Sequence, residues 1–538
     1  MRGLMQDRPL TVDALFRHAE QHFGDQTVCS NGPGGVTRTT YAEWAARTRR
    51  LGGVLDALGV TADGRVGTFA WNSARHLELY FAAPCTGRVL HTLNIRLFPD
   101  QLTYVVDHAE DEVVFVDRSL LPVFWPLVDS MKTVRHVVVM DDGAHEQIPD
   151  DPRVLDHEAL LAEASPVDFH VDDEWRAASM CYTSGTTGNP KGVVYSHRST
   201  WLHTMGVLSG NALGLTVHDV AMAIVPMFHA NAWGIPYAAP AAGAGLVFPG
   251  SMMQPEALAD LIVDEGVTFT AGVPTIWQGV LPHLAGRDHR LRLITCGGSA
   301  VPRSLSEAYR ERVGLPLLQG WGMTETSPVA SLAVVPRRFA DADEATRATQ
   351  RARAGTPLLG VEARIVEPGT TDELPWDDVA TGELQVRGPW CAVDYHDPED
   401  PGALTTEDGW MRTGDVAAMD AYGSIRIADR TKDLIKSGGE WISSVDLENA
   451  IMNHPKVKEA AVVGIPHPKW DERPLACVVV EEGETMTAAE VLEHLRPQVA
   501  KWWLPDAVEF IDEVPKTSVG KFSKKDLRNR FAGYGLPG

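Results

Sequence analysis

Apolar residues follow two periodicities that alternate along the chain. Short β-branched runs, typical of buried strands, occur at 112–116, 137–140, 267–270 and 291–295. Between such runs lie stretches with apolar residues at helical spacing, for example 41–58. This alternation predicts an α/β fold of stacked layers with largely parallel sheets.

The pattern changes near residues 429 and 430. Before this point, 382–388 and 423–427 have the character of antiparallel strands in a small β-barrel-like subdomain. The part that follows is well within the size of an independent domain. We therefore predict an N-terminal domain over 1–429 and a C-terminal domain over 430–538.

The C-terminal part has its own α+β pattern. Residues 444–453 predict a helix, and 460–463 predict a strand. The last stretch, 515–538, contains six basic residues and one acidic residue. A solvated helix face accounts for the basic residues in 524–530, but it does not account for Lys521.

Composition and charge narrow the class of protein. Hydrophobic residues make up 44% and charged residues 22%, as in soluble globular proteins. Lys and Arg total 48 against 72 Asp and Glu, which gives a net charge of −24. So acidic a chain argues against binding nucleic acid, whose phosphates need a cationic face. The uncharged segment 221–255 is broken by prolines and glycines, so we expect core or pocket wall there and no integral membrane contact.

The cysteines and the N-terminus predict a cytoplasmic location. Six cysteines are scattered singly, with no CxxC pair, which favours a reducing compartment. The N-terminal residues lack the apolar stretch of a signal peptide.

The most informative stretch is 182–192, which is rich in glycine and hydroxyl residues and carries a lysine near its end. Glycines let backbone N–H groups turn inward into an anion nest, and hydroxyls add donors. The lysine is followed by glycine, so this phosphate cradle departs from the Walker A pattern. The candidate phosphate contacts are Thr183, Ser184, Gly185, Thr186, Thr187, Gly188 and Lys191.

This loop resembles the signature of the adenylate-forming superfamily, which includes acyl-CoA synthetases, luciferases and nonribosomal adenylation domains. Further segments match in the family's order, at 225–233, 319–328, 410–415, 429–443 and 515–521. The resemblance covers nearly the whole chain. It is strongest to bacterial medium- and long-chain fatty acyl-CoA synthetases and methylmercaptopropionate–CoA ligases.

The resemblance implies an ATP-dependent acid–CoA ligase that works in two steps. A carboxylate attacks ATP and pyrophosphate leaves, and CoA then takes the acyl group as a thioester. The implied small molecules are a carboxylic acid, ATP, CoA and Mg²⁺. The implied fold has a large N-terminal domain and a mobile C-terminal domain, and analogy with relatives suggests a homodimer.

The resemblance also assigns roles at the reacting centre. Lys521 would bridge the acyl carboxylate and the phosphate, while Glu325 and Thr183 would hold Mg²⁺. His229 would position the carboxylate without acting as a base, and Trp233 would gate the acyl tunnel. The acid would also contact Gly298 and Gly322.

The nucleotide would be held by three further side chains. Trp321, where the family more often has tyrosine, would stack on adenine. Asp415 would accept hydrogen bonds from the ribose hydroxyls, and Arg430 would assist at ribose and phosphate. The remaining nucleotide-binding candidates are Gly298, Ser299, Ala300, Gln319, Gly320, Gly322, Met323 and Thr324.

Lys521 and a bulky thiol cannot approach the same carbonyl together, and the family resolves this conflict by rotating its C-terminal domain. Lys432 matches the family's pivot. Lys436 and Trp441 would contact nucleotide in one state, and Gly438 and Gly439 would line the pantetheine channel.

Three alternatives stay open from the sequence. The chain could adenylate an aryl acid or an unusual small acid such as nitrite without CoA, or hand its acid to a carrier protein. It could be a luciferase-like oxygenase or a non-catalytic ATP-binding regulator. Saturated medium or long chains, methylthiopropionate and aryl acids all remain as candidate substrates.

Overall fold

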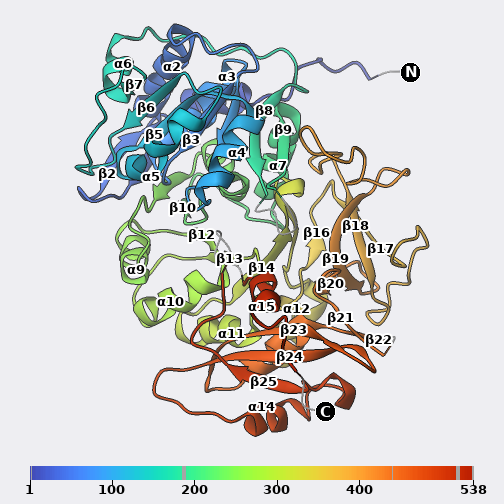
Figure 1. Ribbon diagram of the computed structural model, residues 1–538. Coiled ribbons are helices and arrows are strands. Elements are labelled where there is room, and N and C mark those ends of the chain that lie inside the picture. Colours follow the sequence, from blue (N-terminus) through green and yellow to red (C-terminus); the bar gives the residue numbers. More distant parts are fainter. Residues whose placement is uncertain (2, 184–188, 439, 517–521, 536–538) are drawn as a thin grey trace.

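Two large sheets, parallel except at their edges, build the first part of the chain, as the alternating pattern predicts (Figure 1). The structure is a computed structural model that describes residues 1, 3–183, 189–438, 440–516 and 522–535. In spatial order, the strands of the first sheet are β7 (Val154–Asp156), β6 (His136–Met140), β5 (Asp111–Asp117), β3 (Arg65–Phe69), β4 (Val89–Thr92), β8 (Ala177–Tyr182) and β9 (Gly192–Ser196). Those of the second are β16 (Thr356–Pro357), β15 (Val329–Leu332), β14 (Leu317–Gly322), β13 (Leu293–Cys296), β12 (Phe269–Gly272), β10 (Val220–Ala223), β11 (Gly245–Phe248), β1 (Thr27–Ser30) and β2 (Thr37–Thr40).

Helices connect and cover these strands. The α-helices of this part are α1 (Val12–His22), α2 (Tyr41–Ala57), α3 (Ala74–Cys85), α4 (Pro99–Ala109), α5 (Leu121–Phe124), α6 (His157–Glu163), α7 (His197–Leu208), α8 (Ile235–Ala242), α9 (Pro255–Asp264), α10 (Pro274–Leu284), α11 (Arg303–Arg312) and α12 (Glu344–Arg351). Short 3-10 turns are η1 (Arg118–Leu120), η2 (Trp125–Ser130), η3 (Ala230–Gly234), η4 (Thr324–Thr326), η5 (Arg337–Phe339) and, in the C-terminal part, η6 (Lys501–Trp503).

Helix α2 shows how local sequence determines where a helix begins and which face is buried. Thr40 caps it by accepting the Glu43 backbone N–H, and the Glu43 carboxylate accepts from the Thr40 backbone in return. On the buried face, the Trp44 ring centroid lies 5.1 Å from those of Phe16 and Phe81. The helical spacing at 41–58 therefore reflects one face buried against α1 and α3.

The uncharged segment 221–255 lies in the interior. It contains β10, α8 and β11, and the side chains of Ile235 and Phe248 are fully buried. Among the described helices, none has the length and apolarity to cross a bilayer. The prediction of core and pocket wall for this segment is confirmed.

A four-stranded antiparallel sheet follows the two large ones. Its strands in order are β17 (Glu362–Val366), β18 (Gly382–Arg387), β19 (Met411–Met419) and β20 (Ile425–Arg430). The strands predicted at 382–388 and 423–427 are β18 and β20, with β19 between them.

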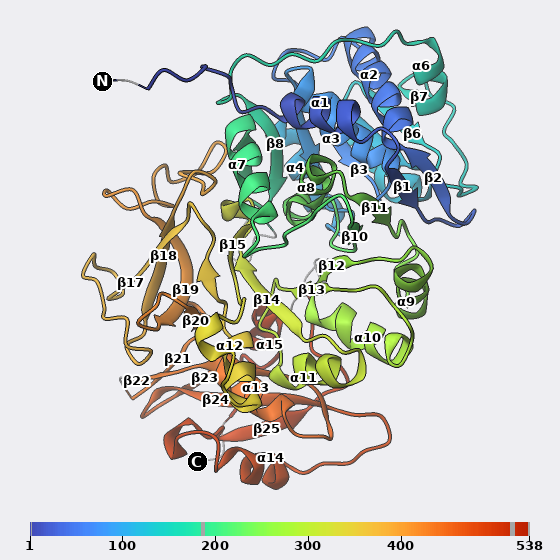
Figure 2. The ribbon, with the colours of Figure 1, turned by 180° about the vertical axis from the view of Figure 1, so that it is seen from behind.

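The last part forms a separate domain, orange to red at the bottom of Figures 1 and 2. The predicted helix at 444–453 and strand at 460–463 are both present, as α13 and part of β23. The elements of this domain are β21 (Ile435–Ser437), β22 (Glu440–Ile442), α13 (Ser444–Met452), β23 (Val457–His467), β24 (Asp471–Val480), α14 (Ala488–Leu495), β25 (Ala507–Phe510) and α15 (Lys524–Arg530).

The solvated helix face predicted for 524–530 is wrong at Lys524. Its side chain is only 11% exposed, and its Nζ lies 2.8 Å from the Glu448 Oε1 and donates to the Ser444 Oγ. Leu527, one turn later, is fully buried, so this face of α15 packs inward on β23. The partner carboxylate is remote in sequence, and the charge pattern therefore could not reveal it.

Candidate functional site

A cavity of about 270 Å³ brings together segments that are far apart in the chain. It lies where β12, β13 and β14 end and where the chain leaves β8 at Thr183, the usual place for ligands in parallel α/β sheets. Strands β14 and β15 approach closely beside it, because a Cβ on Gly322 would lie 1.8 Å from the Pro328 carbonyl oxygen. Only glycine fits at that point of the wall.

The charged end of the cavity is built around Glu325. This carboxylate is 5% exposed and accepts a hydrogen bond of 2.6 Å from the Tyr395 hydroxyl at Oε1. Burial and the nearby Glu325 carboxylate raise the pKa of Tyr395, so its hydroxyl stays a donor at neutral pH. The Lys191 Nζ lies 4.8 Å from the centroid of the same tyrosine ring.

Tyr395 is a lining residue that the sequence did not single out. It lies in the long connection between β18 and β19, 70 residues from Glu325. A tyrosine in such a loop has no local pattern that predicts a role, so only the tertiary contact identifies it.

Trp321, Asp415 and Arg430 form one connected group beside the cavity. The Trp321 Nε1–H donates to the Asp415 Oδ2 at 2.8 Å, and the Arg430 Nε lies 2.8 Å from Oδ1. Asp415 and Arg430 are direct cross-strand partners on β19 and β20, and the carboxylate raises the pKa of the arginine. The sequence predicted these residues separately, and the structure shows that they are bonded to one another.

The other candidates near the base divide into two sets. Gly298 lines the cavity with φ +81°, whereas Ser299 and Ala300 are exposed and lie outside the lining. The Gln319 side chain is buried and accepts the Val301 N–H at 3.1 Å, so it holds the loop rather than facing the cavity. Of the neighbouring candidates, the lining includes Gly320, Gly322, Met323 and Thr324.

His229 and Trp233 lie on the cavity wall at a left-handed turn, which follows His229 and ends at Trp233. Ala230, Asn231, Ala232 and Trp233 have φ of +42°, +51°, +49° and +57°. Left-handed geometry costs about 1–2 kcal/mol for each such residue, so contacts elsewhere must offset the strain. The cavity lining also includes the uncharged residues Leu213, Ile235, Phe269 and Ala271.

The pivot candidates lie beyond β20 and outside the cavity lining. Lys432 and Lys436 are exposed, and Trp441 is 51% exposed. Gly438 adopts φ +62° next to β21. These residues are not brought to the cavity in the domain arrangement that the structure describes.

Asp429 connects the two domains beside this pivot. Its backbone is in β20, paired with Val416 of β19, so it belongs to the antiparallel sheet. Its Oδ2 accepts hydrogen bonds of 2.6 Å from both the N–H and the hydroxyl of Ser444, at the start of α13. One residue thus has its backbone in one domain and its side-chain bonds in the other.

Several predicted site residues lie outside the described part of the chain, and their roles stay predictions. They are Ser184, Gly185, Thr186, Thr187, Gly188, Gly439 and Lys521.

Comparison with known proteins gives consistent matches. A family model described as AMP-binding enzyme matches residues 15–396, and one described as AMP-binding enzyme C-terminal domain matches 446–521. The chain is 45% identical to the 3-methylmercaptopropionyl-CoA ligase of Ruegeria lacuscaerulensis over 99% of both chains. It is 48% identical to the long-chain-fatty-acid–CoA ligase of Thermus thermophilus, over 98% of this chain and 97% of that one. The crystal structure of ATP-bound MatB from Rhodopseudomonas palustris is similar at a TM-score of 0.82 and 27% identity, covering 97% of this chain and 99% of that one.

Proposed function

The chain belongs to the AMP-binding enzyme family, and on that premise we propose that it is an ATP-dependent acid–CoA ligase that forms AMP. The family match agrees with the resemblance found in the sequence. The observation that carries the proposal is the lining of the cavity. It combines the charged residues Lys191, Glu325 and Arg430 with uncharged residues suited to contact with an acyl chain.

In the first step, a carboxylate attacks the α-phosphate of ATP, so two anions must approach each other. Fixed positive charge in a site of low dielectric offsets this repulsion. Lys191 and Arg430 line the cavity, and Lys521 is proposed to bridge the two reacting anions. The Trp321–Asp415 bond fixes the indole beside the space proposed for adenine. His229 is proposed to orient the carboxylate, which is already ionised at neutral pH.

The donor set at the charged end fits Mg²⁺. Carboxylate and hydroxyl oxygens are its preferred ligands, and Glu325 and Thr183 both line the cavity. Within the described residues, no cluster of three or more His, Cys, Asp or Glu side chains could hold a metal by itself. Mg²⁺ that shares its ligands between ATP phosphates and one or two protein oxygens agrees with this. When bound, it would neutralise phosphate charge.

The uncharged part of the cavity lining indicates the class of acid. Leu213, Ile235, Phe269 and Ala271 offer a tail no ionic partner, and burying a charge there would be costly. We infer a monocarboxylic acid with an apolar tail, such as a fatty acid or a methylthio acid. The names of the two relatives, a methylmercaptopropionyl-CoA and a long-chain fatty acid ligase, support this class.

In the second step, the proposed rotation about Lys432 carries the C-terminal domain to a new position. The contacts of Asp429 with Ser444 belong to the described arrangement, and a rotation at residue 432 must break them. The loop that carries Lys436, Gly438 and Trp441 would then line a channel for the pantetheine arm. We place the boundary between the domains at 429 and 430.

We also propose a cytoplasmic enzyme, because all six cysteines are free thiols and five of them are buried. A homodimer stays a prediction by analogy, which a solution mass measurement would decide.

The test is a panel of acids scored by AMP release. The purified protein is incubated with ATP, Mg²⁺ and each acid, with and without CoA, and the acyl-CoA product is identified by mass. We expect sustained AMP release that requires both an apolar monocarboxylic acid and CoA. AMP release with no need for CoA, or none with any acid, would refute the proposal.

A further inference from the structure

The left-handed turn on the cavity wall includes a buried side chain, Asn231, that hydrogen-bonds to strand β8. We propose that Asn231 is a positioning residue that sets the place of His229 and Trp233 on the cavity wall. This inference rests on the proposed function, because it assigns that wall to the acid. Asn231 is only 3% exposed, and it is absent from the cavity lining that its neighbours form.

The Asn231 amide uses both of its ends. Its Nδ2 donates to the Ser179 Oγ at 2.8 Å, and its Oδ1 accepts from the Cys181 thiol at 2.9 Å. Ser179 and Cys181 are fully buried on β8, which pairs with β4 on one side and β9 on the other. A strand paired on both edges is a fixed support, so the amide ties a strained turn to a rigid element.

The residue type suits both demands of this position. Asparagine tolerates left-handed geometry better than other non-glycine residues, and it offers a donor and an acceptor at one end. Aspartate has the same shape, but its carboxylate only accepts and would be a buried charge. Alanine would remove both contacts.

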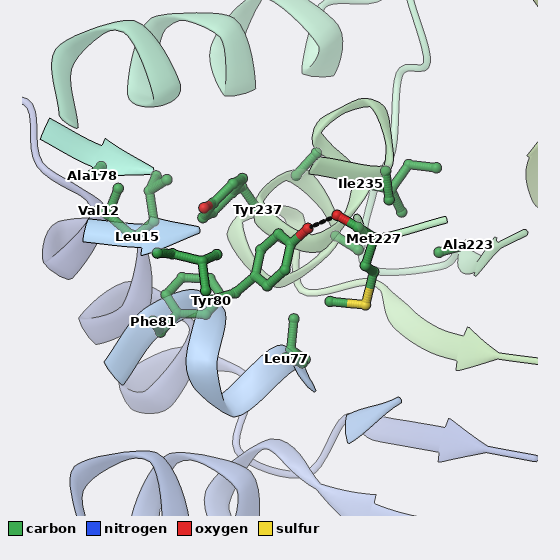
Figure 3. Packing of buried hydrophobic residues seen from close by; sticks show 14 of the residues in the cluster. Val12, Leu15, Leu77, Tyr80, Phe81, Ala178, Ala223, Met227, Ile235 and Tyr237 are labelled. Atoms are coloured by element: carbon green, nitrogen blue, oxygen red, sulfur yellow. Dashed lines mark hydrogen bonds between the residues drawn. The ribbon is translucent and has the colours of Figure 1, made fainter. Parts of the chain in front are cut away.

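The flanks of the turn are fixed independently. Before it, Asn72 bonds to the backbone of Ala223, Val225 and Met227, and the Tyr80 hydroxyl donates to the Met227 carbonyl (Figure 3). After it, Ile235 packs in the buried cluster shown in the same figure. Loss of the Asn231 contacts should therefore release the turn itself, while the flanking segments stay in place.

The consequence concerns binding of the acid more than binding of ATP. His229 and Trp233 sit within two residues of Asn231 and face the cavity, whereas Trp321, Asp415 and Arg430 lie on other strands. We expect a shift of the turn to raise the KM for the acid and to lower kcat, because a small misplacement of reacting groups is costly. The KM for ATP should change little.

The test compares Asn231→Asp, Ser179→Ala and Cys181→Ser with Ser306→Ala as the matched control. Ser306 is also buried and hydrogen-bonded, to the Leu317 carbonyl, but it lies on α11 away from the turn. We expect about tenfold higher acid KM in Asn231→Asp and Ser179→Ala, with the ATP KM within about twofold of wild type. Cys181→Ser keeps a donor for Oδ1 and should stay near wild type.

A second measurement needs no substrate. Hydrogen exchange of the amides in 228–234 should be faster in Ser179→Ala than in wild type and in Ser306→Ala. Unchanged exchange there, or equal rises in the KM for acid and for ATP, would overturn the positioning role. If Asn231→Asp does not fold, Ser179→Ala decides the question. Acid- and CoA-dependent AMP release by the wild type reports separately on the proposed function.

Discussion

Replacing Tyr395 with phenylalanine removes one hydroxyl and keeps the ring. The lost contact is the 2.6 Å hydrogen bond to Glu325 Oε1, whereas the ring that Lys191 approaches remains. A hydrogen bond to a charged group contributes about 1.5–3 kcal/mol, which corresponds to about 10–150-fold in an equilibrium constant. Contacts that orient a metal ligand affect metal affinity by a similar factor, about 10–100-fold.

We therefore expect Tyr395→Phe to raise the Mg²⁺ concentration needed for half-maximal adenylation by about tenfold or more. The assay is acid-dependent pyrophosphate release, titrated with Mg²⁺ at fixed ATP. Saturating Mg²⁺ should restore much of the rate, because Glu325, the proposed ligand, is still present.

Two variants make the comparison specific. Tyr395→Leu also removes the ring beside Lys191, so its KM for ATP should rise in addition. Tyr422→Phe is the matched control, since that tyrosine is exposed and lies outside the cavity lining. An Mg²⁺ dependence identical to wild type in Tyr395→Phe, with the protein folded, would refute the role given to the Tyr395–Glu325 pair.

Four further outcomes are expected. Lys521→Ala should abolish acid-dependent pyrophosphate release but spare thioester formation from preformed acyl-adenylate; equal loss of both steps would contradict the two-state assignment. Lys432→Pro should chiefly slow the thioester step by restricting φ at the pivot, and an intact thioester step would remove the hinge hypothesis. Ala271→Leu should lower kcat/KM for longer acids by about fourfold per excluded methylene, and an unchanged chain-length profile would show that the acyl tail lies elsewhere. Burial raises the pKa of Asp117 from near 3.8 to about 7, so the folded state binds its proton more tightly than the unfolded state. The contribution of Asp117 to stability should therefore fall as pH rises from about 4 to about 7, and Asp117→Asn should remove that contribution from the pH profile of urea unfolding; a profile identical to wild type would count against it.

The layered fold could be predicted from the sequence because the burial of helices and strands determines which nearby positions are apolar. Strands buried on both faces read as β-branched runs, and α2 begins at a capping box within four residues. The glycines and hydroxyls of 182–192 are adjacent in sequence, so a phosphate-binding role could be predicted from them locally, and that role stays a prediction.

Contacts between remote residues left no such signal. Tyr395 reaches Glu325 across 70 residues, Asn231 reaches Ser179 across 52, and Lys524 reaches Ser444 across 80. In each case the chemistry depends on the partner, and the partner is fixed only by the fold. The basic residues in 524–530 predicted a solvated face for that reason, although the Lys524 side chain is only 11% exposed.

The backbone of Asp429 lies in β20 while its side chain bonds to Ser444 at the start of α13, and this has a consequence for the proposed catalytic cycle. The proposed swing at Lys432 would detach the Asp429 carboxylate from Ser444, so the barrier to that swing would be set partly by a residue outside the cavity lining. Substitutions of Asp429 would then change the rate of turnover and leave the specificity for the acid unchanged. Speed and selectivity would be adjustable separately in this chain.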